Sequence, residues 1–178
     1  MERTLIVDQL KLGYEGLFDL PELYRLIDSW FYEKGWDKYE HVNQEQVTSS
    51  GRQIRIVLEP WKSMSDYYKI IIRIKFHAMD VTDVEIEKDK QKVKLNQGEL
   101  RMVFDGYVVS DRQGKWHDKP VLWFLSTIFR KYFFKDYQDK AERWLLSDLD
   151  DLYQKIKSFL NVHRYSSSTP SSQAEVRF

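Results

Sequence analysis

The chain has 178 residues, 42% of them hydrophobic and 15% aromatic, enough to build one domain with its own core but too short for two ordinary domains. Its 28 basic and 28 acidic residues cancel, which argues against a protein that mainly neutralises nucleic-acid phosphates, but leaves room for a local basic patch. The chain contains no cysteine, which excludes disulfides, thiolate catalysis and Cys-ligated zinc.

The hydropathy of the chain gives no sign of a targeting or membrane segment. The N-terminal residues lack the long apolar run of a secretory signal. No stretch approaches the roughly 20 apolar residues that a membrane-spanning helix requires. We therefore expect a soluble, cytoplasmic protein.

The first predicted element is a strand over Thr4–Leu12, which is rich in Leu, Ile and Val. Its imperfect alternation divides the apolar side chains between two faces, with Leu5 and Val7 on one and Ile6, Leu10 and Leu12 on the other. Gly13 and Gly16 are expected to loosen the chain after this strand.

A helix is predicted over Asp19–Lys34. Asp19 is placed to cap it, Pro21 is tolerated in a first turn, and Gly35 is placed to end it. The apolar residues recur at helical spacing: Leu23, Leu26, Ile27, Trp30 and Phe31.

Strands are predicted over roughly 38–110, with no helix among them. Lys38–Thr48 is polar and resembles an edge strand, and a turn at Ser49–Gly51 leads to a strand that Pro60 ends. The clearest strand is Tyr68–Ala78, where apolar residues alternate with Lys69, Ile71, Arg73, Lys75 and His77. Period two predicts that one face of this strand is buried.

The last strands are predicted on either side of a polar turn at Lys88–Gln91. Val84 and Ile86 mark the strand before this turn. After it, Val93 and Leu95 are expected to pair with a final strand over Glu99–Ser110. Gly106, in the middle of that strand, indicates a bulge, a bend or another element packed close to it.

Two helices are predicted to follow. Pro120–Phe134 has a broad apolar surface, and Tyr137–Arg164 carries a regular apolar stripe that includes Leu149 and Leu152. From Ser166 onward the chain is rich in serine and is expected to be a flexible tail (166–178) after a single domain (1–165).

This order predicts an α+β fold: a curved antiparallel sheet of about six strands, with the early helix and two C-terminal helices packed on one face. The order resembles that of the helix-grip superfamily, the START-like and pollen-allergen-like folds. The resemblance covers most of residues 4–164 as topology and implies a cavity between the sheet and a long C-terminal helix. No residue motif is matched, so no functional residue is carried over.

Few motifs indicate chemistry. The pairs His77 with Asp80 and His117 with Asp118 do not match a metal-binding spacing, and the row Asp83, Glu85, Glu87 is typical of a solvated strand face. The glycines form no phosphate-binding loop and no nucleophile elbow. Nothing in the sequence argues for catalysis, and neither a metal nor a cofactor is predicted.

A basic strand face gives a nucleic-acid hypothesis. Lys69, Arg73 and Lys75 share one face, and Arg55 and Arg101 are candidates for neighbouring strands. With interleaved aromatic residues, such a face is typical of single-stranded nucleic-acid binding. Acidic residues occur in the same alternation, however, and favour a cross-strand lattice of ion pairs: Glu59, Glu99 and Asp105.

The leading hypothesis is non-catalytic binding of an apolar or aromatic small molecule between the sheet and the C-terminal helices. The predicted lining residues are Ile72, Ile74, Phe76, Met102, Phe104, Phe124, Ile128, Leu149 and Leu152. Alternatively, these side chains form a solid core and the chain is an adaptor that contacts a protein partner through Trp123 and Phe134. Nucleic-acid binding on the basic face ranks third.

Overall fold

The computed structural model describes residues 2–65, 68–88, 91–110 and 135–167. The strands are β1 (Glu2–Phe18), β2 (Glu40–Thr48), β3 (Gly51–Leu58), β4 (Trp61–Ser63), β5 (Lys69–Lys88) and β6 (Gln91–Ser110), and the helices are α1 (Leu20–Lys34) and α3 (Lys135–Ser167).

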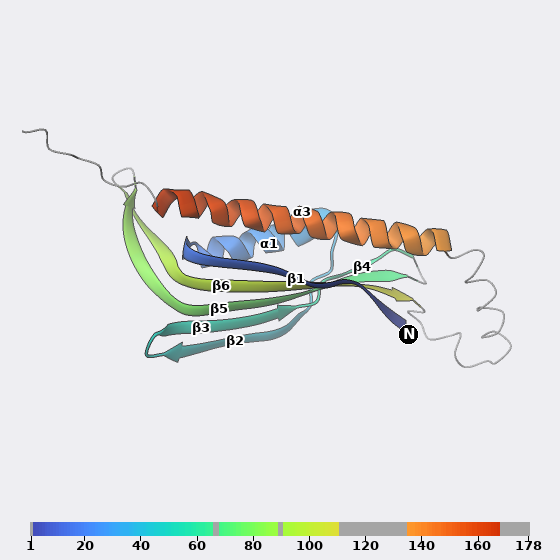
Figure 1. Cartoon of the computed structure of the whole chain (residues 1–178), viewed down its shortest axis with the longest axis horizontal. Helices are drawn as coiled ribbons and strands as arrows, with labels where there is room; N and C mark the ends of the chain where they lie inside the picture. The colour runs from blue at the N-terminus through green and yellow to red at the C-terminus, as the bar shows by residue number, and fades with distance from the viewer. Residues whose placement is uncertain (1, 66–67, 89–90, 111–134, 168–178) are drawn as a thin grey trace, which may run out of the picture.

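All the strands form one antiparallel sheet in the order β1-β6-β5-β3-β2, with β4 also paired to β5. Both described helices lie on the same face of the curved sheet (Figure 1). The predicted α+β class, with a six-stranded antiparallel sheet, an early helix and a C-terminal helix, is therefore confirmed. The predicted helix Pro120–Phe134 and most of the serine-rich segment lie outside the described residues.

Helix α1 begins and ends where the sequence predicts. The Asp19 carboxylate accepts a hydrogen bond from the Glu22 amide at 2.8 Å, which caps the first turn. Gly35 adopts a left-handed conformation (φ 67°) at the other end, and the Trp36 amide donates to the Phe31 carbonyl at 2.8 Å.

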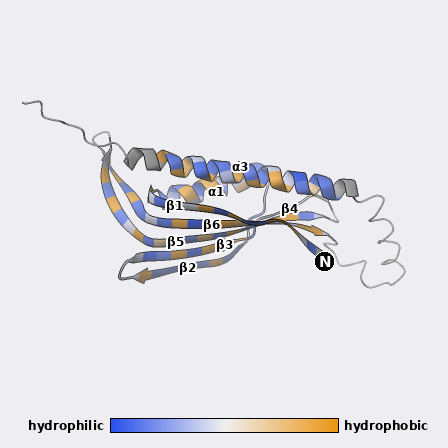
Figure 2. Ribbon diagram, in the orientation of Figure 1, coloured by the Kyte–Doolittle hydropathy of each residue, from blue (hydrophilic) through white to orange (hydrophobic). Residues whose placement is uncertain are grey.

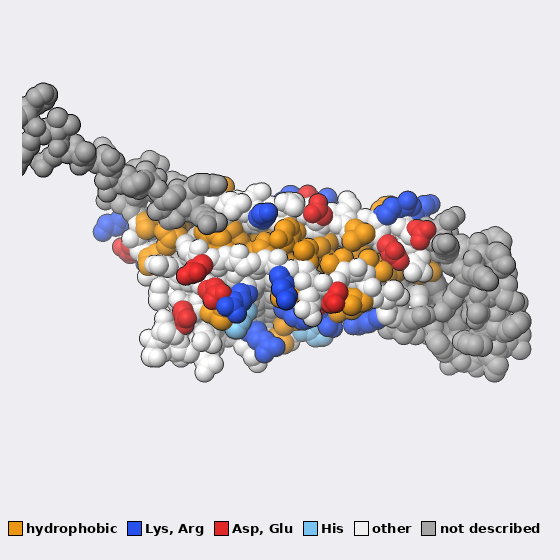
Figure 3. Space-filling model, in the orientation of Figure 1, with side chains coloured by type: hydrophobic (Ala, Val, Ile, Leu, Met, Phe, Trp, Pro, Cys, Tyr) orange, Lys and Arg blue, Asp and Glu red, His pale blue; other side chains and the backbone are white. Residues whose placement is uncertain are grey.

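Helix α3 lies over the sheet with an apolar stripe that repeats at helical spacing (Figure 2). The stripe is buried against β1, β5 and β6 and consists of Ala141, Leu145, Leu149, Leu152, Ile156 and Leu160. Hydrophobic side chains also gather on the surface where α3 lies over β1 (Figure 3). Ile6, Leu10 and Tyr153 are half-buried against the core.

Two buried tryptophans join α1 to α3. The Trp30 indole donates to Asp151 at 2.8 Å, and the Trp36 indole donates to Asp148 at 3.0 Å. The hydrogen bond from Trp30 lowers the pKa of the Asp151 carboxyl, and the Lys34 ammonium 3.2 Å away acts in the same direction. These contacts fix the position of α1 beside the long helix.

The long hairpin of β5 and β6 corrects one prediction. Each strand runs unbroken for 20 residues. Val93 pairs with Ile86 and Leu95 with Val84, so the predicted pairing of Val93 and Leu95 with residues 99–110 is wrong. Those residues belong to the same strand, β6.

A bulge explains why the sequence pattern predicts two strands where the structure has the single strand β5. The register between β5 and β6 shifts between Met79 and Thr82, and Asp80 has a positive φ of 52°. Ala78 and Val81 are both buried although they are three residues apart, so the period-two pattern stops while the strand continues.

Strand β1 also departs from the prediction, because it extends to Phe18 through both glycines. Its register shifts on either side of Val7, so Leu5 pairs with Tyr107 but Val7 pairs with Gly106. Leu5 and Val7 therefore lie on opposite faces, not on one. A Cβ on Gly106 would lie 3.2 Å from a Leu145 methyl and 3.3 Å from Val7, so this glycine admits a closely packed element, one of the predicted alternatives.

A candidate anion-binding groove on the open face of the sheet

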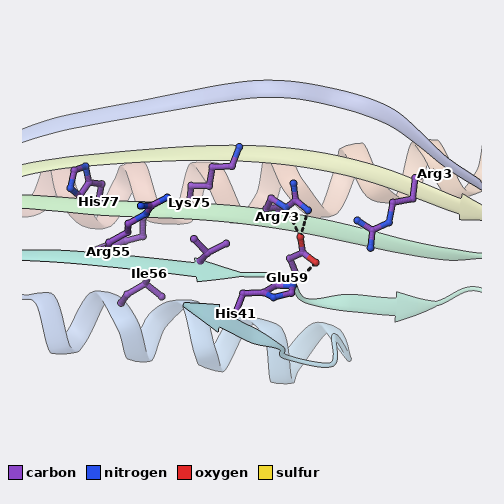
Figure 4. Close-up of a pocket in the computed structure, with 10 residues that line it drawn as sticks. Arg3, His41, Arg55, Ile56, Glu59, Arg73, Lys75 and His77 are labelled. Carbon is purple, nitrogen blue, oxygen red and sulfur yellow. Dashed lines mark hydrogen bonds and ion pairs between the residues drawn. The ribbon is translucent and has the colours of Figure 1, made fainter. Parts of the chain in front are cut away.

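The face of the sheet that turns away from α1 and α3 is called the open face here. The register places the outward side chains of β5 and β6 opposite one another in rows: Ile71 with Tyr107, Arg73 with Asp105, Lys75 with Val103, and His77 with Arg101. This face contains a groove of about 730 Å³ (Figure 4). It is lined by Arg3, His41, Arg55, Ile56, Val57, Glu59, Arg73, Lys75, Phe76 and His77.

Glu59 is the acidic centre of the groove and is 9% exposed. The Arg73 guanidinium donates to one of its oxygens, and His41 Nε2 lies 2.8 Å from the other (Figure 4). Burial raises the pKa of the Glu59 carboxyl, but the hydrogen bonds and charges of His41 and Arg73 outweigh burial, and the pKa lies below its usual value. Glu59 is therefore ionised at neutral pH.

A second ion pair lies beside the first. The Lys75 ammonium donates to Asp105 at 2.9 Å, and the other Asp105 oxygen accepts a hydrogen bond from the Gln9 amide at 3.0 Å. Asp105 is 3% exposed, so its charge is compensated by these two donors. The predicted cross-strand ion pairs are thus confirmed for Arg73 with Glu59 and for Lys75 with Asp105.

Further along the open face, the basic side chains do not all have an acidic partner. Arg55 of β3 lies directly opposite His77 of β5, which lies directly opposite Arg101 of β6. All three side chains are exposed, and we call them the basic row. Arg101 donates to Glu99 at 2.6 Å, whereas no residue in the described parts of the chain forms an ion pair with Arg55 or His77.

Arg55 and Arg101 lie on the two strands that flank β5, one on each side of His77, so an anion above the row can contact both guanidinium groups. Guanidinium groups are suited to bind phosphate or carboxylate oxygens in pairs, and a histidine between them adds a donor. The arrangement can therefore hold an anionic group on the surface of the sheet.

The described residues that were predicted to line an internal cavity lie in the core between the sheet and α3, and only Phe76 of these also lines the groove. Ile72, Ile74, Met102, Phe104 and Leu152 have no accessible surface, Leu149 is 3% exposed and Phe76 is 5% exposed. Side chains that line a cavity large enough for water have some accessible surface, and the first five of these residues have none. A ligand could therefore bind beside them only if the side chains moved apart. That they bind a ligand stays a prediction. Phe124, Ile128, Trp123 and Phe134 lie outside the described residues.

Sequence reasoning identified the cations of β5 and the acids that pair with them, but it missed Arg3 and His41. The strand that carries His41 is exposed on both faces, so no burial pattern assigned its side chains to a face. The Arg55–His77–Arg101 alignment also needs the pairing register, which period two alone does not supply.

Within the described ranges, no group of three or more His, Asp and Glu side chains is arranged to hold a metal ion. No helix in the same ranges combines the length and the apolar character needed to cross a membrane. Comparison with models of protein families, with curated proteins and with solved structures finds no match to this chain. The helix-grip resemblance therefore stays a prediction.

Proposed function

We propose that this protein binds a phosphate-rich anionic ligand in the groove on the open face of its sheet. The observation that carries the proposal is the basic row, in which Arg55 and Arg101 flank His77 and only Arg101 has a described carboxylate partner. An anion over this row supplies the partner that Arg55 lacks among the described residues and forms charge-assisted hydrogen bonds with the guanidinium groups.

The distribution of charge on the open face supports the same proposal. Glu59 and Asp105 each form an ion pair within the sheet, and both are nearly buried, so their charges are compensated locally. The register places Lys11 and Glu15, both exposed, two positions on either side of Gly13, the β1 partner of Arg101, so these two charges offset one another. The chain is neutral as a whole, but the exposed part of this face carries an excess of positive charge.

The core supports this location over the space between the sheet and α3. Binding on the open face requires no movement of the packed side chains, whereas binding beside Ile72 or Phe104 requires them to separate. A surface groove lined by cations also favours a charged ligand over an apolar one.

The proposal is tested by the affinity for inorganic polyphosphate, measured by isothermal titration calorimetry at low and moderate salt. The variant R55Q/R101Q is compared with R143Q/K157Q, which removes two exposed cations from α3 and so loses the same charge. We expect the first variant to bind about tenfold more weakly or worse, and its affinity to depend less on salt because fewer counterions are released. The second should bind like the unmodified protein.

Equal losses in the two variants would show that binding reflects net charge and not the basic row. No binding at low salt would reject the proposal outright. Thermal unfolding of each variant checks that the sheet is intact, and because all four substituted side chains are exposed, little change is expected.

A further inference from the structure

Two tyrosines lie beside the charged groups of the groove. Tyr39, which immediately precedes β2, is 56% exposed, and its ring lies 4.7 Å from the ring of His41 in an edge-on arrangement. Tyr107 of β6 lies under the Arg73 guanidinium, 5.4 Å from the ring centroid. One ring therefore contacts His41 and the other contacts Arg73, and these are the two partners of Glu59.

From these aromatic groups we infer that the ligand is single-stranded nucleic acid, with its phosphates on the basic row and its bases stacked on Tyr39 and on the Arg73 guanidinium that lies over the Tyr107 ring. This inference rests on the proposed anion-binding function and adds the class of ligand. Aromatic rings interleaved with cations on an exposed sheet bind single strands because every base has a face that can stack.

The distance along the sheet between Tyr107 and the basic row fits a short single strand of nucleic acid. Ile71, the partner of Tyr107, is six residues from His77 along β5, which corresponds to about 20 Å of extended strand. A ligand that reaches both must be extended, and a segment at the short end of the range of about 4–16 nucleotides for one binding domain has the required length. A free phosphate reaches only one of the two regions.

The position of Arg73 favours a base over a second phosphate near Tyr107. The guanidinium already lies against the ring while it is paired with Glu59, so its charge is compensated and its flat face remains available for stacking. A base at this position stacks on the outer face of the guanidinium, with the Tyr107 ring beneath it. Bases in a duplex have no free face and cannot stack in this way, so duplex DNA is expected to bind more weakly.

The experiment measures the fluorescence anisotropy of a labelled oligothymidylate of 12 nucleotides. Inorganic polyphosphate and a DNA duplex of the same length serve as competitors. Y39A is expected to weaken oligothymidylate binding about fivefold or more, the effect of losing one stacked base. Y39F keeps the ring and should bind like the unmodified protein. Y32A removes a tyrosine that is 89% exposed on α1 and should have no effect.

Affinity for polyphosphate separates the inference from the proposed function. We expect Y39A and Y107A to leave polyphosphate binding unchanged while both weaken oligothymidylate binding, and R55Q/R101Q to weaken both. If both tyrosine variants bind oligothymidylate normally, or if the duplex binds more tightly than the single strand, the inference is wrong and anion binding stands. If neither probe binds, both proposals are wrong. Tyr39 is exposed, so Y39A is informative even if Y107A fails to fold.

Discussion

The two faces of β5 follow different rules within one strand. Ile72 and Ile74 have no accessible surface and pack beneath α3, whereas Arg73 and Lys75, which alternate with them, form ion pairs on the open face. On the covered face, shape and volume decide which side chain fits. On the open face, charge pairing across strands decides, and each contribution is smaller because water competes.

This difference between the two faces indicates which side chains are available to bind a ligand. Side chains of the covered face are held by packing and cannot change without loss of stability. The side chains of the Arg55–His77–Arg101 row are exposed, and Arg55 and His77 form no ion pair with the described residues, so they can bind a ligand without disturbing the core.

The sharpest test of the comparison replaces neighbouring residues of β5. I72A removes a completely buried side chain and is expected to lower the free energy of unfolding by about 2–5 kcal/mol. H77A, on the open face, should change it by less than about 0.5 kcal/mol. Urea denaturation measures both. Similar losses would mean that the open face is also packed, and a neutral I72A would mean that the core beneath α3 is loose.

A second test concerns the bend in the long hairpin. Gly51 has a φ of 144°, and a Cβ there would lie 2.7 Å from the backbone carbonyl carbon of Asp80, at the β5 bulge. G51A is therefore expected to cost about 1–3 kcal/mol in backbone strain. Gly13 has open space around it and no positive φ, so G13A is the matched control and should be nearly neutral. Equal thermal stability of the two variants would show that the backbone at the β5 bulge shifts at little cost to make room for the added Cβ.

The sequence was most informative where structure is local. Period two over Tyr68–Ala78 predicted the buried side chains of the covered face, although Ile71 on the open face is buried as well. Asp19 and Gly35 predicted both ends of α1, because such signals depend on neighbours along the chain. The bulge at Asp80 was missed because a non-glycine residue with positive φ leaves no signal in composition.

The candidate site was predicted only in part, for a related reason. Arg73 and Lys75 were assigned to one face by alternation, and their acidic partners by residue type. The alignment of Arg55 with His77 and Arg101 depends on pairing between strands far apart in sequence. The Tyr39–His41 contact lies where β2 begins, in a segment without an apolar pattern.

The smallest expected effect comes from the acidic centre of the groove. E59Q removes the charge that Arg73 and His41 share. At pH 7 we expect a loss of about 1.5 kcal/mol, the lower end for hydrogen bonds to a charged group, because both partners are partly exposed to water. E45Q is the control, since the ion pair of Glu45 within the described residues is an exposed one, with Arg52 at 3.4 Å.

The pH dependence of the E59Q effect follows from the direction of the pKa shift. Because the pKa of Glu59 is lower in the folded protein than in the unfolded chain, its stabilising contribution is complete above the unfolded value of about 4.3. It is lost as the pH falls through the lower, folded value. The difference in unfolding free energy between the unmodified protein and E59Q should therefore be fully present above about pH 4.3 and shrink below it. A difference that stays constant down to pH 3 would assign the effect of Glu59 to packing, and would make this part of the open face resemble the covered one.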